Sequence, residues 1–201
     1  SFSASDVARF DQWQDYLAER ASQLDVEAAT AYWAAQIQTE LPQVDANNTY
    51  ENSAQVSVSL SQELTQKLLG DANVAYKTRV QELLLTALAK VLGQWQQLPD
   101  VTLELEGHGR ESGDSDLDLS TSIGWFTSRF PQKLSAVVDW ESALIHNKEQ
   151  LRRLPEKGLE YGLLRYLSLS GADTGSQDAA SKPSFKQIFN ERSHSFVSFN
   201  Y

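Results

Sequence analysis

A helix and a strand joined by a tight turn constrain the fold of this chain more than any other feature. Residues 79–97 repeat apolar side chains at helical spacing, which predicts a helix whose apolar stripe packs on a core. The stripe comprises Val80, Leu84, Leu88, Val91, Leu92 and Trp95. Thr78 is the expected N-cap, and Pro99-Asp100 turns the chain into the next element.

Residues 101–106 alternate between apolar and polar side chains, as expected for a strand with one buried face. The predicted core face comprises Val101, Leu103 and Leu105, and the opposite face comprises Thr102, Glu104 and Glu106. The strand therefore ends on a carboxylate, next to the glycines of the following loop.

The rest of the chain mixes helical and extended patterns. Further helices are expected at residues 6–23, 26–38, 140–154 and 157–167, and a short one runs from the cap Ser61 to Leu69. Further strands are expected at residues 55–60, 126–134 and 195–201, and residues 170–184 are expected to form a loop. Helices and strands alternate without an internal repeat, which predicts an α/β fold.

Composition excludes several classes of function. The 201 residues carry a formal net charge of −10, which argues against binding to nucleic acid or to an anionic membrane surface. Without cysteine the chain has no thiolate nucleophile, so any thioester chemistry requires a thiol from elsewhere. No membrane span or signal peptide is visible, and a soluble, cytoplasmic protein is expected. The absence of methionine suggests a piece of a longer polypeptide.

The loop after the strand holds the candidates for chemistry. Glu106 stands beside Gly107 and Gly109, and it is either a general base or a surface carboxylate that begins a turn. His108 is either a proton-transfer group or a side chain that hydrogen-bonds to its own loop. On residue pattern alone the structural alternative is the more common one in both cases.

Other patterns predict no site. The three histidines and the acidic residues lack metal-ligand spacing, and no phosphate loop, dinucleotide fingerprint or serine-hydrolase elbow is present. A solvated loop is expected for Glu111, Asp114, Asp116 and Asp118, and a core position for Trp125, Phe126 and Phe130. A solvated face, or less often a site for a phosphate-bearing partner, is expected for Lys148, Arg152, Arg153 and Lys157.

Four motifs in order carry a family resemblance. They are "LEGHGRE" at residues 105–111, "DLSTSIGWFTSRFP" at 118–131, "KGLEYGLLRYL" at 157–167 and "SFNY" at 198–201. Together with "FDQWQDYLAERA" and "TAYWAAQI" near the start, they resemble the epimerization domains of nonribosomal peptide synthetases, within the condensation-domain superfamily. The resemblance covers nearly the whole chain.

The resemblance implies a fold and a missing half. Family members fold as two chloramphenicol-acetyltransferase-like lobes, each with a mixed sheet packed by helices, and their HHxxxD motif lies in the first lobe. This chain is similar to the second lobe, with residues 1–40 as an inter-lobe helical segment and residues 41–201 as a C-terminal lobe that is incomplete at its end. No His-His pair occurs here.

The resemblance also implies an activity. An L-aminoacyl or peptidyl thioester, presented on the 4′-phosphopantetheine arm of a peptidyl carrier protein domain, would be converted to the D-form by removal and return of its α-proton. The chain itself would bind no cofactor, and its partners would be the carrier domain, the missing lobe and neighbouring synthetase domains.

The implied site has three parts. Glu106 and Tyr201 would be catalytic, the first as an acid–base group and the second as a hydrogen-bonding phenol, and Asn200 would position the thioester. A scaffold role falls to Gly107, His108, Gly109, Arg110 and Trp125. Relatives commonly have Ser-Arg-Thr where this chain has Ser120-Thr121-Ser122, which puts the ion pair of that arginine in doubt.

Two alternatives remain open. A condensation domain of the same superfamily would form peptide bonds instead, although such domains usually lack "EGHGRE". A non-catalytic lobe that only binds a carrier protein is the other alternative, and the fragment without its first lobe is expected to show no turnover.

Overall fold

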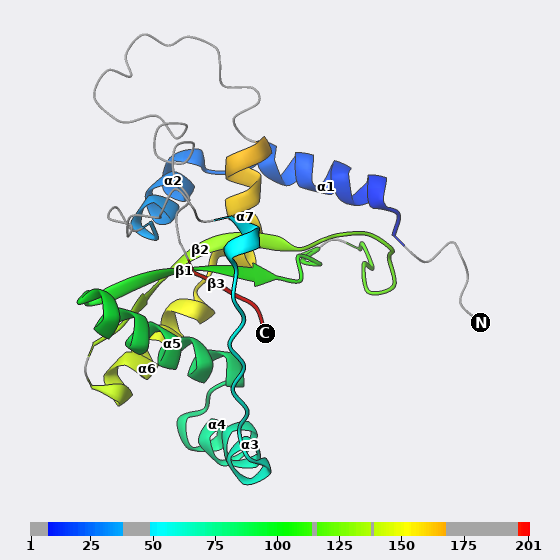
Figure 1. Cartoon of the computed structure of the whole chain (residues 1–201). Helices are drawn as coiled ribbons and strands as arrows, with labels where there is room; N and C mark the ends of the chain where they lie inside the picture. Colours follow the sequence, from blue (N-terminus) through cyan, green and yellow to red (C-terminus); the bar gives the residue numbers. More distant parts are fainter. Residues whose placement is uncertain (1–7, 38–48, 114–115, 138, 168–196) are drawn as a thin grey trace, which may run out of the picture. The chain divides into compact units, whose positions relative to one another are not determined.

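The computed structural model describes residues 8–37, 49–113, 116–137, 139–167 and 197–201. Within them helices and strands are mixed, as predicted (Figure 1). The longer helices are α1 (Phe10–Ser22), α2 (Val26–Ala35), α3 (Gln62–Leu69), α5 (Val80–Gln96) and α6 (Trp140–Arg152). The shorter helices are α4 (Asp71–Tyr76) and α7 (Leu159–Gly162), and the strands are β1 (Asp100–Gly107), β2 (Ser128–Ser135) and β3 (Ser198–Phe199). No helix in the described ranges is long and apolar enough to span a membrane.

The predicted elements are largely confirmed, with shifted ends. Ser61 caps α3 as expected, because its hydroxyl oxygen accepts a hydrogen bond of 3.3 Å from the backbone N–H of Leu64. Helix α5 begins one residue later than predicted, so Arg79 is its N-cap and the Thr78 hydroxyl bonds to Asn73 instead. Helix α4 was missed. The predicted loop 170–184 and the start of the last predicted strand lie outside the described residues.

The described strands form one sheet in the order β2-β1-β3. Strand β3 pairs with β1 in parallel, so that Glu104 lies opposite Ser198 and Leu105 opposite Phe199. The predicted core face of β1 is confirmed, because Val101, Leu103 and Leu105 are all buried. Its other face carries the half-buried Glu104 and Glu106, also as predicted.

The chain divides into two compact units. Among the described residues the first unit holds 8–37, 102–113, 116–133, 153–167 and 197–200, and the second holds 49–101, 134–137, 139–152 and 201. Each unit therefore gathers segments that are far apart in the sequence.

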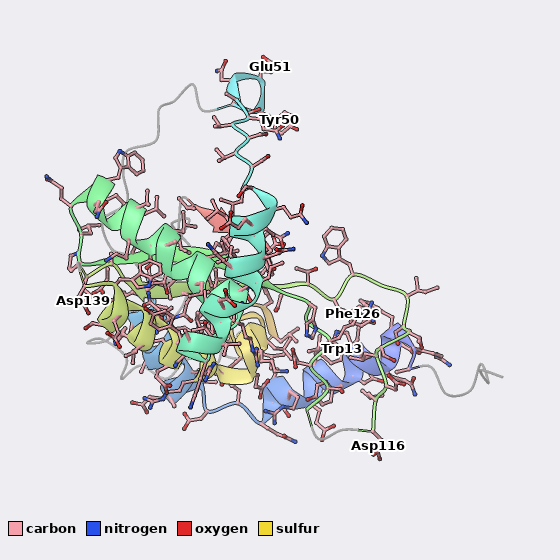
Figure 2. All side chains as sticks on the ribbon, turned by 90° about the horizontal axis from the view of Figure 1, so that it is seen from below. Trp13, Tyr50, Glu51, Asp116, Phe126 and Asp139 are labelled. Atoms are coloured by element: carbon pink, nitrogen blue, oxygen red, sulfur yellow. The ribbon has the colours of Figure 1, made fainter. Side chains whose placement is uncertain are left out.

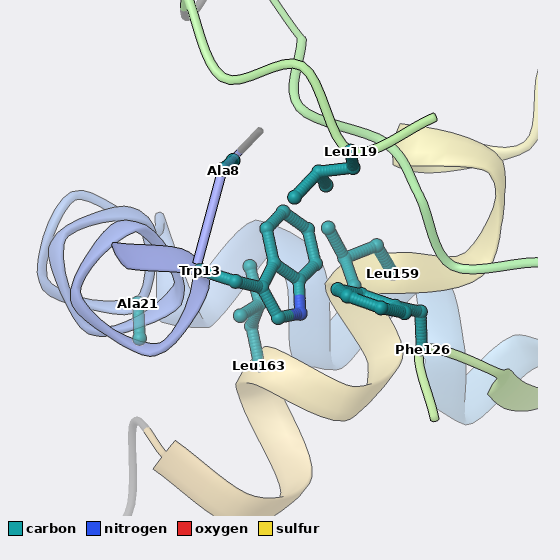
Figure 3. Packing of buried hydrophobic residues seen from close by; sticks show 7 residues of the cluster. All are labelled: Ala8, Trp13, Ala21, Leu119, Phe126, Leu159 and Leu163. Atoms are coloured by element: carbon teal, nitrogen blue, oxygen red, sulfur yellow. The ribbon is translucent and has the colours of Figure 1, made fainter. Parts of the chain in front are cut away.

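An aromatic cluster forms part of the core of the first unit. The Trp13 indole on α1 packs against Phe126, with 6.0 Å between the ring centres, and Figures 2 and 3 show the two rings side by side. Buried aliphatic residues complete the cluster: Ala8, Ala21, Leu119, Leu159 and Leu163. This packing joins α1, α7 and the loop after β1 into one body.

Trp33 on α2 is a second anchor of this unit. It is fully buried and contacts the rings of Phe130 and Tyr161, and its Nε1 donates a hydrogen bond of 3.0 Å to Oε1 of Glu160. Burial raises the pKa of the Glu160 carboxyl and raises the pKa of Tyr161 to about 12. Helices α2 and α7 are thus joined by both packing and a partly buried hydrogen bond.

The second unit is built on the pair α5 and α6, which lie side by side (Figure 1). Its interior contains the buried side chain of Asn147, whose Oδ1 accepts a hydrogen bond of 2.7 Å from the Ser135 N–H. The Asn147 amide also donates to the Ser135 carbonyl at 3.0 Å and to the Thr86 hydroxyl at 3.4 Å. One side chain therefore links α6, α5 and the end of β2.

The predicted apolar stripe of α5 was wrong. Val91 and Trp95 are exposed, the latter to 67%, whereas the buried residues are Glu82, Leu83, Leu85, Thr86, Ala89 and Gly93. Both faces of this helix carry apolar residues, so periodicity did not select the buried one. Gly93 belongs to the packed face because a Cβ there would lie 2.2 Å from that of Ala136.

The predicted strand 55–60 was also wrong. Residues 53–61 are neither helix nor strand, and Val56 and Val58 are each 88% exposed. Alternation favours a strand only where a neighbouring strand supplies hydrogen bonds, and in the described sheet this segment has no place.

The helix predicted at 157–167 is a composite. It begins as a 3₁₀ turn, Pro155–Gly158, continues as α7 and ends as the π-helical turn Leu163–Leu167. Glu156 and Lys157 have positive φ values of 42° and 50°, and Gly158 follows at 93°. A Cβ at Gly158 would lie 2.1 Å from the Phe130 ring, so only glycine fits this turn.

Candidate active site

Glu106 is the second-last residue of β1, and its carboxylate is held from two sides. The side-chain amide of Asn200 donates a hydrogen bond of 3.2 Å to Oε2, and Arg129 Nε lies 3.6 Å from Oε1. Arg129 also pairs with Glu104, which lies two residues earlier on the same strand face. The Glu106 side chain keeps 28% exposure, so an outside group can still reach it.

Two glycines after Glu106 let the loop backbone approach Phe126 and Ser128 closely. A Cβ at Gly107 would lie 2.8 Å from the Ser128 hydroxyl oxygen, and one at Gly109 would overlap the Phe126 carbonyl oxygen at 1.5 Å. Gly109 also has a φ of 69°, in the left-handed region. These contacts bring the loop against β2 and account for both glycines structurally.

His108 is engaged within the loop. Its Nδ1 accepts a hydrogen bond of 3.0 Å from the Arg110 backbone N–H, and its Nε2 lies 3.0 Å from Glu111. Glu111 also accepts a hydrogen bond of 2.8 Å from Lys157 Nζ, and its side chain is mostly buried. Glu111 is thus not the solvated carboxylate that the sequence predicted, although Asp116 and Asp118 are exposed.

Arg110 organises the loop that follows. Its guanidinium carbon lies 4.1 Å from the centre of the Phe126 ring, and its side chain donates to the Leu119 carbonyl. Within that loop the Asp118 carboxylate accepts a hydrogen bond from the Ser120 N–H, and hydrogen bonding by Ser120 lowers the pKa of Asp118. These contacts shape the segment between Arg110 and Trp125.

The predicted site residues are only partly brought together. Glu106 and Asn200 are in contact, whereas Tyr201 is exposed. Trp125 is 86% exposed, so its predicted core position is wrong, while Phe126 and Phe130 are buried as expected. Asp114 and His194 lie outside the described residues, and no cluster suited to a metal ion occurs in the part that is described.

Sequence reasoning missed Arg129 and a cavity beside it. The cavity has a volume of about 550 Å³ and is lined mainly by apolar residues of α1, α7 and residues 125–129. The charged side chain of Arg129 also lines it. The signal for Arg129 was available, because a cation at the start of a strand that follows two alternating carboxylates can pair across strands. The cavity had no sequence signal, because its walls come from three separate segments.

The predicted basic patch is paired rather than free. Arg152 Nε bonds to the buried Glu82 at 3.1 Å, Lys148 donates to the Tyr76 carbonyl, and Lys157 pairs with Glu111 as described. Arg152, Arg153 and Lys157 are exposed, as expected for a solvated face, and Lys148 is half-buried.

Comparison with known proteins identifies the family. The model of the condensation domain family matches residues 2–192. One linear gramicidin synthase subunit from Brevibacillus parabrevis is 34% identical over 100% of this chain, and another from the same organism is 38% identical over 90%. The chain spans only 2% and 4% of these two proteins.

Solved structures agree in fold. The epimerization domain from the third module of tyrocidine synthetase B matches with a TM-score of 0.71 at 32% identity, over 81% of this chain and 39% of that one. SgcC5 from Streptomyces globisporus matches with a TM-score of 0.61 over 79% of this chain and 36% of that one, and at 13% identity it shows a shared fold alone. The predicted α/β fold is confirmed, and the chain belongs to the condensation domain family.

Proposed function

We propose that this chain forms the Glu106-bearing lobe of an epimerization domain in a nonribosomal peptide synthetase. Its substrate would be an aminoacyl or peptidyl thioester on the phosphopantetheine arm of a peptidyl carrier protein domain. The observation that carries the proposal is the half-buried Glu106 carboxylate, which lies near the end of β1 and is oriented by Asn200 and Arg129. The likeness to a solved epimerization domain at 32% identity supports the same choice.

The reaction follows from the acidity of the thioester. The Glu106 carboxylate takes the α-proton, and the electron pair of the broken C–H bond passes into an enolate-like intermediate. A second acid–base group, the histidine of an HHxxxD motif on another lobe, returns a proton to the opposite face. Inversion needs both groups, since a single base returns the proton to the face from which it came.

Neighbouring residues receive supporting roles. Asn200 orients Glu106 through its amide, and it stands next to Tyr201, whose exposed phenol would hydrogen-bond the reacting group. Gly107, Gly109 and Arg110 keep the loop in place against β2 and Phe126. The preorganised loop therefore supports the position of the Glu106 carboxylate near the end of the strand.

The test is α-hydrogen exchange in deuterated water. A carrier domain loaded with an aminoacyl or peptidyl group is incubated with the intact two-lobed domain, and deuterium at the α-carbon is measured by mass spectrometry. Glu106→Gln is expected to lower the exchange rate by about 100-fold or more. Glu141→Gln, an exposed residue of α6, is the matched control and should exchange as the parent does.

The outcomes separate the alternatives. If Glu106→Gln exchanged the α-hydrogen at the parent rate, the proposal would be contradicted. Peptide-bond formation without exchange would identify a condensation domain, and carrier binding without either reaction would identify a non-catalytic lobe.

A further inference from the structure

Arg129 sits between two carboxylates of one strand face. Its guanidinium makes an ion pair with Glu104 and places Nε 3.6 Å from Oε1 of Glu106. Glu104 and Glu106 are two residues apart on β1, so their Cα atoms are separated by roughly 6.6 Å. Without a cation between them, the two carboxylates would repel each other, and each would turn away from its neighbour.

The two contacts of Arg129 differ in strength. The pair with Glu104 is close and hydrogen-bonded, whereas the separation from Glu106 exceeds a hydrogen bond. Arg129 thus attracts the Glu106 carboxylate without occupying a lone pair of Oε1, while Oε2 is fixed by Asn200. A carboxylate that is hydrogen-bonded at one oxygen, and whose other oxygen accepts no hydrogen bond from a described residue, suits proton removal.

We propose that the Glu104–Arg129 ion pair is a positioning device for Glu106, an inference that rests on the proposed epimerization. Glu104 has a definite part in it, because it keeps the guanidinium engaged. If Glu104 loses its charge, Arg129 is free to form a bidentate pair with Glu106 and to take up the oxygen that accepts the α-proton. If Arg129 is removed, Glu104 repels Glu106 from its working position.

Loss of Arg129 and loss of Glu104 are expected to have different effects on the charge around Glu106. Arg129 is 58% exposed on its side chain, so the pair contributes little to folding stability, and its value lies in orientation. The charges of Glu104, Arg129 and Glu106 sum to one negative charge. Loss of the cation leaves two negative charges, and loss of Glu104 leaves a neutral pair.

The experiment uses the same exchange assay on the intact domain with a loaded carrier domain, with kcat and KM measured separately. Arg129→Met is expected to lower kcat roughly 10- to 100-fold while KM for the loaded carrier stays within about threefold. Arg129→Lys keeps the charge but loses the fork, and it should fall between Arg129→Met and the parent. Arg9→Met removes a similar exposed pair with Asp11 and is expected to change nothing.

The double variant Glu104→Gln/Arg129→Met is the decisive one. Removal of Glu104 relieves the repulsion that Arg129→Met creates, so the double variant is expected to recover at least about fivefold over Arg129→Met. A purely structural role for Arg129 would give additive losses and no recovery. Circular dichroism and thermal melting of each variant establish that the fold is intact.

The outcomes distinguish the inference from the proposal beneath it. If Glu106→Gln abolishes exchange and Arg129→Met matches the parent, only the positioning role fails. If Arg129→Met raises KM and leaves kcat unchanged, Arg129 binds substrate and the inference is overturned. If Glu106→Gln exchanges at the parent rate, the proposed function fails, and the positioning role fails with it.

Discussion

The guanidinium of Arg110 lies over the ring of Phe126, 4.1 Å from the ring centre, and this contact closes the loop that begins at Glu106. The same side chain donates to the Leu119 carbonyl, so one residue fixes the loop at two points. The arginine of the "EGHGRE" motif therefore acts on the shape of the loop in this structure. Its guanidinium contacts Phe126 and Leu119 rather than Glu106.

Arg110→Lys is expected to destabilise the chain by about 1–2 kcal/mol, because an ammonium group replaces neither the planar stacking nor the geometry of the bond to Leu119. Urea unfolding of parent and variant measures the difference. Arg9→Lys, at an exposed arginine, serves as the control and should leave the unfolding midpoint unchanged. Equal stability of parent and Arg110→Lys would contradict this account.

Two glycines near α7 provide a matched pair. Gly158→Ala is expected to destabilise by about 2–5 kcal/mol, because its positive φ is unfavourable for alanine and the new Cβ would overlap the Phe130 ring. Gly162→Ala meets no atom within 4 Å and should stabilise α7 by about 0.5–1 kcal/mol. Thermal melting tests both, and similar effects at the two positions would contradict a requirement for glycine at position 158.

Asn147→Ala is expected to cost about 2–4 kcal/mol, because the buried N–H and carbonyl of Ser135 both lose their partner. The Thr86 hydroxyl keeps its bond to the Glu82 carbonyl, so the loss concentrates on the end of β2. Denaturant unfolding measures it, with His146→Ala on the exposed side of α6 as the control. A loss below about 0.5 kcal/mol would contradict a central role for Asn147.

Glu160→Gln tests the half-buried carboxyl that accepts the hydrogen bond of Trp33. Burial raises the pKa of Glu160, so the folded state holds this proton more tightly than the unfolded chain. The stability from this group is present below the unfolded pKa near 4.5 and is lost as pH rises through the folded value. The glutamine keeps an acceptor for Trp33 and does not titrate.

The variant is therefore expected to gain stability relative to the parent as pH rises from 4 to 7. Urea midpoints across that range measure the gain, and parallel profiles of parent and variant would contradict it.

Asn200 offers a test of the contact with Glu106, within the proposed function. Asn200→Ala removes the donor to Oε2 and is expected to slow α-hydrogen exchange about tenfold, because the carboxylate loses one of its two anchors. Asn200→Asp places a second negative charge at that point and should slow it further. If Asn200→Asp were faster than Asn200→Ala, the orienting role of the amide would be excluded.

Much of the local structure was predictable from the sequence. The alternation over residues 101–106 predicted both the strand and its buried face, because the period of two that makes the pattern also decides which side chains meet the core. The cap Ser61 and the helices of residues 80–96 and 140–152 were likewise predictable, since a hydroxyl cap and helical spacing act within a few residues.

Where a sequence pattern was compatible with two arrangements, only the tertiary structure determined which residues are buried. Helix α5 buries Leu83, Leu85 and Ala89 and leaves Leu84, Leu88 and Trp95 more exposed, and contact with α6 decides which apolar residues are buried. The segment 55–60 alternates like a strand, yet it is exposed, because alternation supplies no hydrogen-bond partner.

The candidate site shows the same division. The sequence by itself determined that a carboxylate ends a strand beside two glycines, because local pattern specifies strand, face and turn. The tertiary structure decided which residues surround that carboxylate. Arg129 lies on β2, and Asn200, which comes directly after β3, is 94 residues from Glu106 in the sequence. Orientation of a side chain depends on groups brought near by packing, and no local spacing specifies which of them arrive.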